Sequence, residues 1–297
     1  MSSYQKRTDI VFGTQTTYIM MRNTWMIFLT ALLVCTSAMA QVRWKDVHAL
    51  IYTRNGKGYV HENRAASVEM MKNLSKEHGF KLDVSDDPAI FTDENLSKYD
   101  LLIFSNTNND VFDTDAQRTA FRRYIESGGG FVGLHSVMGT ERNWTWFKQM
   151  LGGTFSWHAV NQTFKVRNLR PDHPSMQGVP ALWERKDECY FSKELFPGIE
   201  VLMVHELASL DRKQEAEILK NAGHYKDFYP TAWYHAYDGG HVWVTTLGHD
   251  IFNYSEPVYM NHVLQGLRYI AGKTAKRNLG KSYAADRDTP LSIFQSK

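Results

Sequence analysis

Cysteine is scarce in this chain. The 297 residues include two cysteines, Cys35 and Cys189, and Cys35 lies in an N-terminal segment that we expect to be removed. Cys189 is then left without a partner, so no intramolecular disulfide is possible. Residues 41–297 are enough chain to bury a large apolar core without one, since the buried fraction of the surface rises with chain length.

Long hydrophobic runs are also missing. The apolar run Trp25–Val34 is too short to span a bilayer comfortably. It follows Arg22 and precedes Ser37-Ala38-Met39-Ala40, the order of charged, apolar and small residues that is typical of a secretory signal peptide. We therefore expect cleavage near Ala40, export to the periplasm or the extracellular space, and no membrane span in the mature protein.

The sequence allows more than one translation start. Residues 1–20 are polar and carry no part of the signal pattern, so the translation start is left open between Met1, Met20 and Met21. A lipoprotein signal is not expected, because Val34 precedes Cys35 where a small residue would be required.

Neither sign of charge dominates. The chain has 34 Lys plus Arg and 32 Asp plus Glu, and the formal charge of +2 comes from the leader, where Lys6, Arg7 and Arg22 stand against Asp9. The remainder is neutral and has no source of long-range attraction to phosphates. We therefore expect neither nucleic acid nor an anionic membrane surface as a partner, and the oligomeric state is left open.

Strand and helix patterns alternate through the first half of the body. Short apolar runs predict strands at 46–52, 101–105 and 131–135. Between them, Val68, Met71 and Leu74 have helical spacing, and Thr114 with Gln117 forms a capping-box sequence. Alternation of this kind predicts an open, doubly wound α/β sheet that is mostly parallel.

The second half has a different pattern. Strands are predicted at 201–205, 231–235 and 241–246, and Asp238-Gly239 is a two-residue hairpin signal. We expect this hairpin at one edge of the sheet. A closing helix is predicted from Pro257 to Gly272. No linker splits the chain, so the predicted organisation is an N-terminal extension and signal peptide (1–40), one domain (41–272) and a polar C-terminal tail (273–297).

Polar residues gather where the predicted strands end. His61 lies in the loop after the first strand, Asn108 follows the second, His135 ends the third and His249 follows the strand 241–246. Open α/β sheets bind their ligands at the carboxyl ends of their strands. Several imidazoles at that edge could exchange protons near neutral pH or bind a divalent metal ion.

The run Gly133-Leu134-His135-Ser136 carries the most information. A glycine-framed strand that enters a sharp turn exposes a catalytic residue in many α/β enzymes, and His135 would occupy that position. Imidazole can act as a base, an acid or a metal ligand, but it cannot replace a nucleophilic thiolate. Because Cys189 has no glycine frame, a Cys-dependent amidotransferase is not expected.

Several short motifs follow one another along the chain: Ser127–Ser136, Trp144-Thr145-Trp146-Phe147, Asp172–Ser175, Trp183 with Asp187-Glu188, Ala232–His235 with Gly239-Gly240, and Gly248-His249. With them, the stretch 46–272 resembles the ThuA-like (trehalose utilisation) family. The resemblance implies a flavodoxin-like three-layer sandwich of the class I glutamine amidotransferase-like superfamily, without that superfamily's catalytic triad. It also implies a role in disaccharide or keto-glycoside metabolism.

Four residues are the candidate catalytic groups. We expect His135 and Glu188 to exchange protons, and His61 and His249 to orient a substrate or a divalent ion. Each has a structural alternative: His135 could cap the following helix, and Glu188 could pair with a neighbouring basic residue at the surface. Whether a metal is bound is left open, because the sequence contains no short-spaced ligand pair.

Five further residues are candidate substrate ligands. Aromatic rings stack on the apolar faces of sugars while amides and acids bind the hydroxyls, and the candidates are Asn108, Trp144, Trp146, His158 and Asp187. The alternative for the tryptophans is burial in the core. His173, His48 and His235 are expected to have structural roles, the first in a turn and the other two inside strands.

Three functions remain open from the sequence. The first is an exported enzyme, a hydrolase or a lyase, acting on a glycoside or an oxidised sugar in a His-rich cleft. The second is a sugar-binding module without catalysis. The third is a metal-dependent hydrolase of another substrate class.

Overall fold

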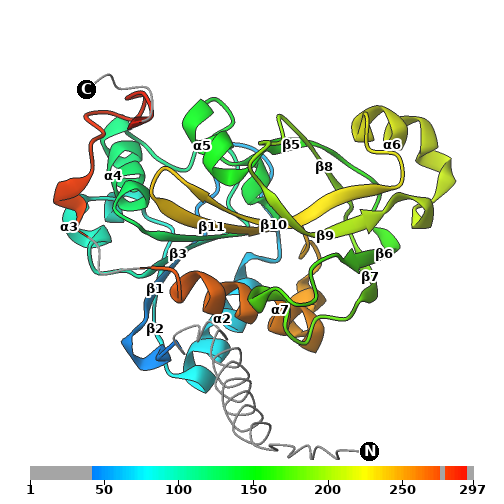
Figure 1. The fold of residues 1–297 in the computed structure, drawn as a ribbon, viewed down its shortest axis with the longest axis horizontal. Coiled ribbons are helices and arrows are strands. Elements are labelled where there is room, and N and C mark those ends of the chain that lie inside the picture. The colour runs from blue at the N-terminus through cyan, green and yellow to red at the C-terminus, as the bar shows by residue number, and fades with distance from the viewer. Residues whose placement is uncertain (1–41, 275–277, 293–297) are drawn as a thin grey trace, which may run out of the picture. The chain divides into compact units, whose positions relative to one another are not determined.

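A nine-stranded sheet organises the body of the chain. The computed structural model describes residues 42–274 and 278–292, so the predicted signal peptide lies outside the described residues. The strand order is β2-β1-β3-β4-β11-β10-β9-β6-β7 (Figure 1). The strands are β1 His48–Tyr52, β2 Lys81–Ser85, β3 Leu101–Ser105, β4 Gly130–Leu134, β6 Gln162–Asn168, β7 Leu182–Asp187, β9 Glu200–Glu206, β10 Phe228–Tyr237 and β11 Gly240–Thr245. A separate two-stranded sheet pairs β5 Thr154–His158 with β8 Tyr190–Lys193.

The sheet has a parallel half and an antiparallel half. From β2 to β11 the neighbouring strands run parallel, and from β11 to β7 they run antiparallel. Every residue of β3 and of β4 is buried, as expected for strands covered by helices on both faces. The predicted strands at 101–105 and 131–135 are therefore confirmed, with His135 just outside β4.

The predicted hairpin forms, but not at the edge of the sheet. Tyr237 pairs with Gly240, and the two turn residues Asp238 and Gly239 have φ angles of 46° and 93°, the left-handed conformations that a tight hairpin turn requires. Its location at an edge is corrected, because β9, β6 and β7 extend the sheet beyond β10. The sequence predicts β9, as the strand at 201–205, but not β6 or β7.

Helices cover both faces of the sheet and complete three layers (Figure 1). One apolar cluster joins α2 and α7 to one face through Met71, Ile51 and Leu267, and a second joins α4 and α5 to the other face through Phe121 and Phe147. The flavodoxin-like α/β fold is thereby confirmed. The helices are α2 Arg64–His78, α3 Asp93–Leu96, α4 Asp115–Glu126, α5 Thr145–Leu151, α6 Glu215–Ala222 and α7 Pro257–Ala271; none of these described helices is long and apolar enough to cross a membrane.

The start of α4 has the capping box that the sequence predicts. The Gln117 backbone N–H donates to Thr114 Oγ1 at 3.3 Å, and Gln117 Oε1 accepts from the Thr114 backbone N–H at 3.2 Å. Two of the backbone donors that every helix N-terminus leaves unpaired are satisfied in this way. The predicted closing helix is confirmed as α7, with Pro257 as its first residue.

The described part of the C-terminal segment packs against α4. The Arg122 guanidinium is buried, pairs with Glu126 at 2.9 Å and donates to the carbonyl oxygens of Arg287 and Thr289. The indole N–H of Trp144 also donates to the Arg287 carbonyl, at 3.1 Å. Residues 278–292 therefore cover a part of the core that would otherwise hold unpaired polar atoms.

Two buried histidines predict how stability depends on pH. His205 and His262 have no hydrogen-bond partner for either ring nitrogen among the described residues. Burial, reinforced by the charge of Arg185, lowers the pKa of each from 6.5 to about 3. Since the unfolded chain binds these protons more readily, the free energy of unfolding decreases as the pH falls below about 6.5, by about 1.4 kcal/mol per pH unit for each histidine.

The measurement is urea unfolding between pH 7 and pH 4. His205→Leu removes one of the two groups, so the decline should become shallower by about 1.4 kcal/mol per pH unit. His224→Leu, at an exposed histidine, should leave the slope as it is. Equal slopes in the wild-type chain and in His205→Leu would contradict the interpretation.

Candidate functional site

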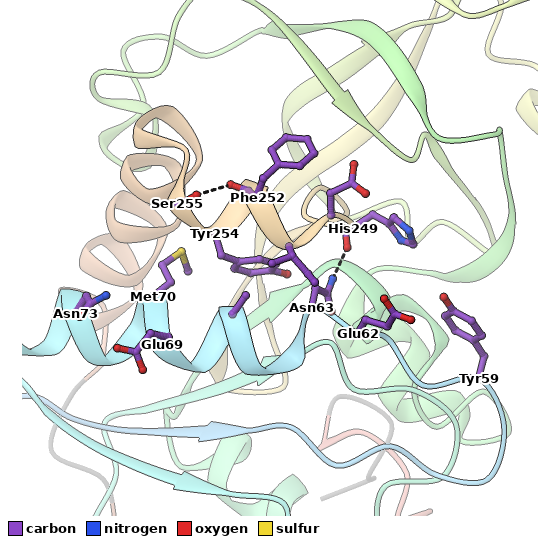
Figure 2. Close-up of a pocket in the computed structure, with 13 residues that line it drawn as sticks. Tyr59, Glu62, Asn63, Glu69, Met70, Asn73, His249, Phe252, Tyr254 and Ser255 are labelled. Carbon is purple, nitrogen blue, oxygen red and sulfur yellow. Dashed lines mark hydrogen bonds between the residues drawn. The ribbon is translucent and has the colours of Figure 1, made fainter.

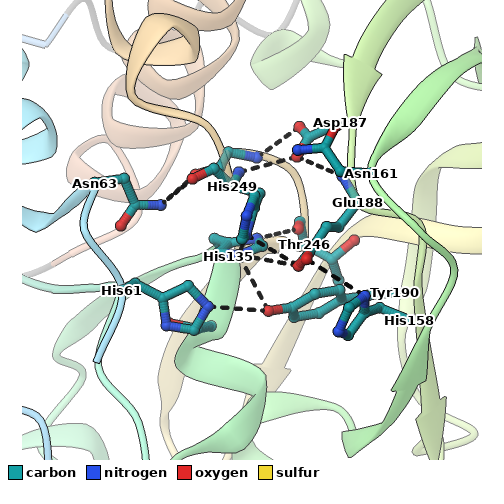
Figure 3. Close-up of polar contacts among 12 residues, drawn as sticks. His61, Asn63, His135, His158, Asn161, Asp187, Glu188, Tyr190, Thr246 and His249 are labelled. Atoms are coloured by element: carbon teal, nitrogen blue, oxygen red, sulfur yellow. Dashed lines mark hydrogen bonds and ion pairs between the residues drawn. The ribbon is translucent and has the colours of Figure 1, made fainter. Parts of the chain in front are cut away.

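Three histidines from distant parts of the chain meet above the sheet. His61 precedes α2, His135 directly follows β4, and His249 follows β11. Their ring centroids lie 5.0 to 5.8 Å apart, and one ring nitrogen of each lies within 4.8 Å of the others (Figure 3). The expectation that His61, His135 and His249 gather at the carboxyl ends of the strands thus matches the arrangement of the side chains.

The backbone at His135 aims its ring at this meeting point. His135 has a φ of 50°, a left-handed conformation that is uncommon outside glycine and marks strained turns at functional sites. Nδ1 lies 2.9 Å from the Thr246 carbonyl oxygen, and because a carbonyl only accepts hydrogen bonds, Nδ1 carries the proton. In the neutral ring Nε2 therefore carries the lone pair. It lies 3.0 Å from the Tyr190 hydroxyl.

Glu188 brings a carboxylate against the same group of rings. Oε2 lies 3.0 Å from His249 Nδ1 and 3.9 Å from His135 Nε2, while Oε1 lies 3.3 Å from His158 Nδ1. The Glu188 side chain is 9% exposed, so it makes these contacts away from bulk water. The surface pairing with Arg185 or Lys186 that the sequence left open does not occur at Glu188.

Burial and neighbouring charges give the three rings different proton affinities. Burial, together with nearby His249, lowers the pKa of His61 to about 4. Burial also holds the pKa of His135 well below its usual value. Burial lowers the pKa of His249 as well, but the hydrogen bond and charge of Glu188 outweigh it, so the net shift is upward. The site thus combines two neutral imidazoles with an imidazole–carboxylate pair.

Asp187 positions the main chain that carries His249. It is fully buried, pairs with Arg185 at 2.8 Å, and accepts the backbone N–H groups of Gly248 and His249 at 2.8 and 2.9 Å. It does not line the cavity at the site. Its expected role as a substrate ligand is therefore corrected to a positioning role, because its carboxylate faces the main chain that carries His249.

A cavity of about 430 Å³ opens in front of the cluster. Of the predicted substrate ligands, Asn108 and His158 line it. Trp144 and Trp146 do not: they are 1% and 6% exposed and stack on each other in the core beside α4. The sugar-stacking role expected of them is corrected, because their indole N–H groups are bound by Arg287 and Asp238.

A second cavity adjoins the first. It measures about 620 Å³ and lies between the start of α2 and the 3-10 turn Ile251–Ser255 (Figure 2). Tyr59 and His249 line both cavities. Phe252 is 48% exposed on its wall and Glu62 and Asn63 border it, so the His cluster stands beside an extended, partly aromatic cleft.

Comparison with known proteins assigns this architecture. The family model described as ThuA, trehalose utilisation, matches residues 48–270. The chain belongs to the ThuA family. No curated protein matches it.

Several solved structures share the fold, and two of them are of ThuA-like proteins. A ThuA-like protein from Bacteroides uniformis is 24% identical, with a TM-score of 0.60 over 79% of this chain and 95% of that chain. A second, from Parabacteroides merdae, is 18% identical, with a TM-score of 0.61 over 77% of this chain and 91% of that chain. A cytoplasmic protein from Salmonella typhimurium is 14% identical, with a TM-score of 0.52 over 75% and 99%.

Several residues that line the 430 Å³ cavity are not among the candidates from the sequence. Tyr190 lies two positions after Glu188, and strand periodicity could have placed it on the same side. Tyr59, Arg142 and Phe155 also line the cavity, and nothing in their sequence context pointed to it. The three histidines expected to be structural make local contacts: His173 accepts the Ser175 backbone N–H, and His235 donates a ring N–H to the Met150 carbonyl oxygen. His48 is half-buried and lies 3.0 Å from Asp83 Oδ2.

The positioning role of Asp187 can be tested by its removal. Asp187→Ala removes the closer of the two carboxylate partners of the buried Arg185 guanidinium and leaves the backbone N–H groups of Glu188, Gly248 and His249 without this acceptor. The free energy of unfolding should therefore fall by about 3–5 kcal/mol. Glu184→Ala, at an exposed position on the same strand, should change it by no more than about 0.5 kcal/mol. A loss below about 1 kcal/mol for Asp187→Ala in urea unfolding would refute the role.

Proposed function

We propose that the protein is an enzyme of carbohydrate metabolism in which Glu188 transfers a proton to or from a sugar bound in the 430 Å³ cavity. The observation that carries the proposal is the position of the Glu188 carboxylate, which lines the cavity and touches His249 and His158. A carboxylate held among imidazoles can accept a proton from the substrate, and the imidazoles can pass that proton on. The trehalose-utilisation description of the family supports a sugar as substrate.

The lining of the cavity suits a polyhydroxylated ligand. Asn108 and Arg142 hydrogen-bond to each other at 3.2 Å on its wall, and Ser136 adds a hydroxyl. The rings of Tyr59 and Phe155 provide apolar surfaces. Polar groups at fixed positions together with aromatic faces are what a pyranose requires.

The carboxylate count favours elimination over classical glycoside hydrolysis. Most glycoside hydrolases use two carboxyl groups on either side of the scissile bond. Glu188 is the one acid that lines the 430 Å³ cavity, while Glu62, Glu69 and Asp250 line only the adjoining 620 Å³ cavity. We therefore propose a lyase-type step on an oxidised sugar. Glu188 takes the proton from the carbon next to a ketone, and a carbon–carbon double bond forms as the glycosidic C–O bond on that carbon's other neighbour breaks. The same proton passes from Glu188 through an adjacent imidazole to the leaving oxygen.

The adjoining cavity extends the substrate to at least two sugar units. Because Tyr59 and His249 line both cavities, a bond held beside His249 would have one sugar in the 430 Å³ cavity and the other in the 620 Å³ cavity. Phe252 and Tyr59 would supply the stacking surfaces of the second unit. The substrate class that this arrangement supports is an oxidised disaccharide.

Export is part of the same proposal. The leader pattern at residues 22–40 supports removal of the segment and action outside the cytoplasm. N-terminal sequencing of protein recovered from the periplasm or the medium should give Gln41 as the first residue. Recovery of the uncleaved chain from the cytoplasm alone would argue against export.

Glu188→Gln tests the catalytic proposal. The amide keeps the size of the side chain but cannot take a proton, so turnover of keto-disaccharides should fall about 10²–10⁴-fold while binding remains. Turnover is followed by mass spectrometry of the released sugar, and affinity by calorimetry. Glu184→Gln is the matched control. Binding without turnover in the wild-type chain, across disaccharides and their keto forms, would instead identify a sugar-binding module.

Phe252→Ala tests the two-cavity arrangement. Loss of one stacking surface should weaken disaccharide binding roughly two- to tenfold and leave monosaccharide binding unchanged. Leu219→Ala, an exposed apolar residue of α6, serves as the control and should affect neither ligand. An equal loss for both ligands would contradict a separate second subsite.

A further inference from the structure

We propose that His61, His135 and His249 form a binding site for one divalent transition-metal ion, with Zn²⁺ as the best-matched ion and with an open coordination position that faces the cavity. The inference goes beyond the proposed function, because ion binding can be measured without any sugar. It starts from the distances among the three rings, one nitrogen of each lying within 4.8 Å of the others.

The spacing of two nitrogens already fits a metal site. His135 Nε2 and His249 Nδ1 are 3.4 Å apart, and two nitrogens bound at about 2.1 Å to a tetrahedral ion are separated by about 3.4 Å. The third ring, His61, has its centroid 5.0 Å from that of His135. A small rotation of its side chain would complete three-point ligation.

The ligand atom of His135 is fixed in advance. Its Nδ1–H donates to the Thr246 carbonyl oxygen at 2.9 Å, which leaves the Nε2 lone pair directed at the cluster. Metal-binding histidines nearly always donate their second ring nitrogen to a carbonyl or a carboxylate in this way. The main chain of His249 is likewise held, by Asp187 at its N–H and by Asn63 at its carbonyl oxygen.

One ring nitrogen of the cluster has no protein partner: His61 Nδ1 is buried without a hydrogen bond to any described residue. The Tyr190 hydroxyl lies 3.0 Å from His135 Nε2 and 3.4 Å from His61 Nε2, but a hydroxyl has a single hydrogen and can donate to one of them. A cation at the centre of the three rings would pair with every lone pair directed there. Without an ion, His249 Nδ1 can carry a proton and donate it to Glu188 Oε2 at 3.0 Å or to His135 Nε2 at 3.4 Å. Ion binding therefore displaces that proton, because a ligating imidazole nitrogen must be deprotonated.

The chemistry of the ligands selects the ion. Imidazole nitrogens suit Zn²⁺ and its first-row neighbours, whereas Mg²⁺ and Ca²⁺ prefer oxygen ligands. Three protein ligands with a fourth open position are typical of catalytic zinc sites. Glu188 stands next to the cluster but outside the three-residue group, so it stays free to carry protons beside a sugar oxygen bound to the ion.

The experiment uses the full chain without a polyhistidine tag. The protein is stripped with a chelator, dialysed and titrated with Zn²⁺, and the bound metal is counted by mass spectrometry. Co²⁺ is then substituted, because the visible absorption of Co²⁺ reports the number and type of its ligands. We expect one ion per chain and a spectrum of low-coordinate, nitrogen-ligated cobalt.

Variants separate the cluster from other histidines. His61→Ala and His249→Ala should each weaken Zn²⁺ binding about 100-fold or more, since loss of an outer partner alone costs about 10–100-fold. His135→Asn, a residue that tolerates the left-handed backbone, should do the same. His158→Ala removes a cavity histidine outside the group and should keep the ion. Circular dichroism checks that each variant is folded. If one variant does not fold, the cobalt spectra of the folded variants still test whether the three histidines are the ligands.

The outcomes distinguish this inference from the proposed function. No stoichiometric Zn²⁺, or equal loss of the ion in His158→Ala and the cluster variants, would overturn the metal site. Full turnover by the metal-free protein would show that the ion is not needed for catalysis. The proposal that the protein acts on sugars would then still stand. Stoichiometric Zn²⁺ without any turnover would support the site and overturn the enzyme.

Discussion

The parallel pairing of β4 with β11 is the contact on which the site depends. Leu134 pairs with Thr245, so the next residues, His135 and Thr246, leave the sheet side by side. The hydrogen bond between the Thr246 carbonyl and His135 Nδ1 is a direct consequence of that register. This hydrogen bond fixes the orientation of the His135 ring. It also leaves Nε2 as the nitrogen that can accept a proton or bind a metal ion.

Much of this half of the molecule could be predicted from the sequence. Buried parallel strands are short apolar runs, and 101–105 and 131–135 have that form. Their ends carry Asn108 and His135, and loops after parallel strands converge at one edge. The local sequence pattern and the tertiary position of these residues agree. The sequence therefore predicts correctly that the three histidines lie close together.

The antiparallel half was harder, for physical reasons. β6 and β7 alternate between buried and exposed residues. In β7 two of the three buried positions are the charged residues Arg185 and Asp187, so the alternation is not one of apolar and polar residues. The sequence indicated that Asp187 and Glu188 mattered but could not tell that the first faces backbone N–H groups and the second faces imidazoles. Trp144 and Trp146 failed as sugar ligands because aromatic motifs look alike whether they line a cleft or fill a core.

The division of the cluster along the chain has a consequence for when it forms. His61 belongs to the first strand and loop, whereas His249 follows β11, so a nascent chain that ends before β11 lacks part of the set. Partial products of synthesis therefore cannot capture a ligand with the affinity of the finished protein. The ion proposed for the three rings would therefore be acquired only after β11 has joined the sheet, and its supply at that stage would set how much of the protein is loaded.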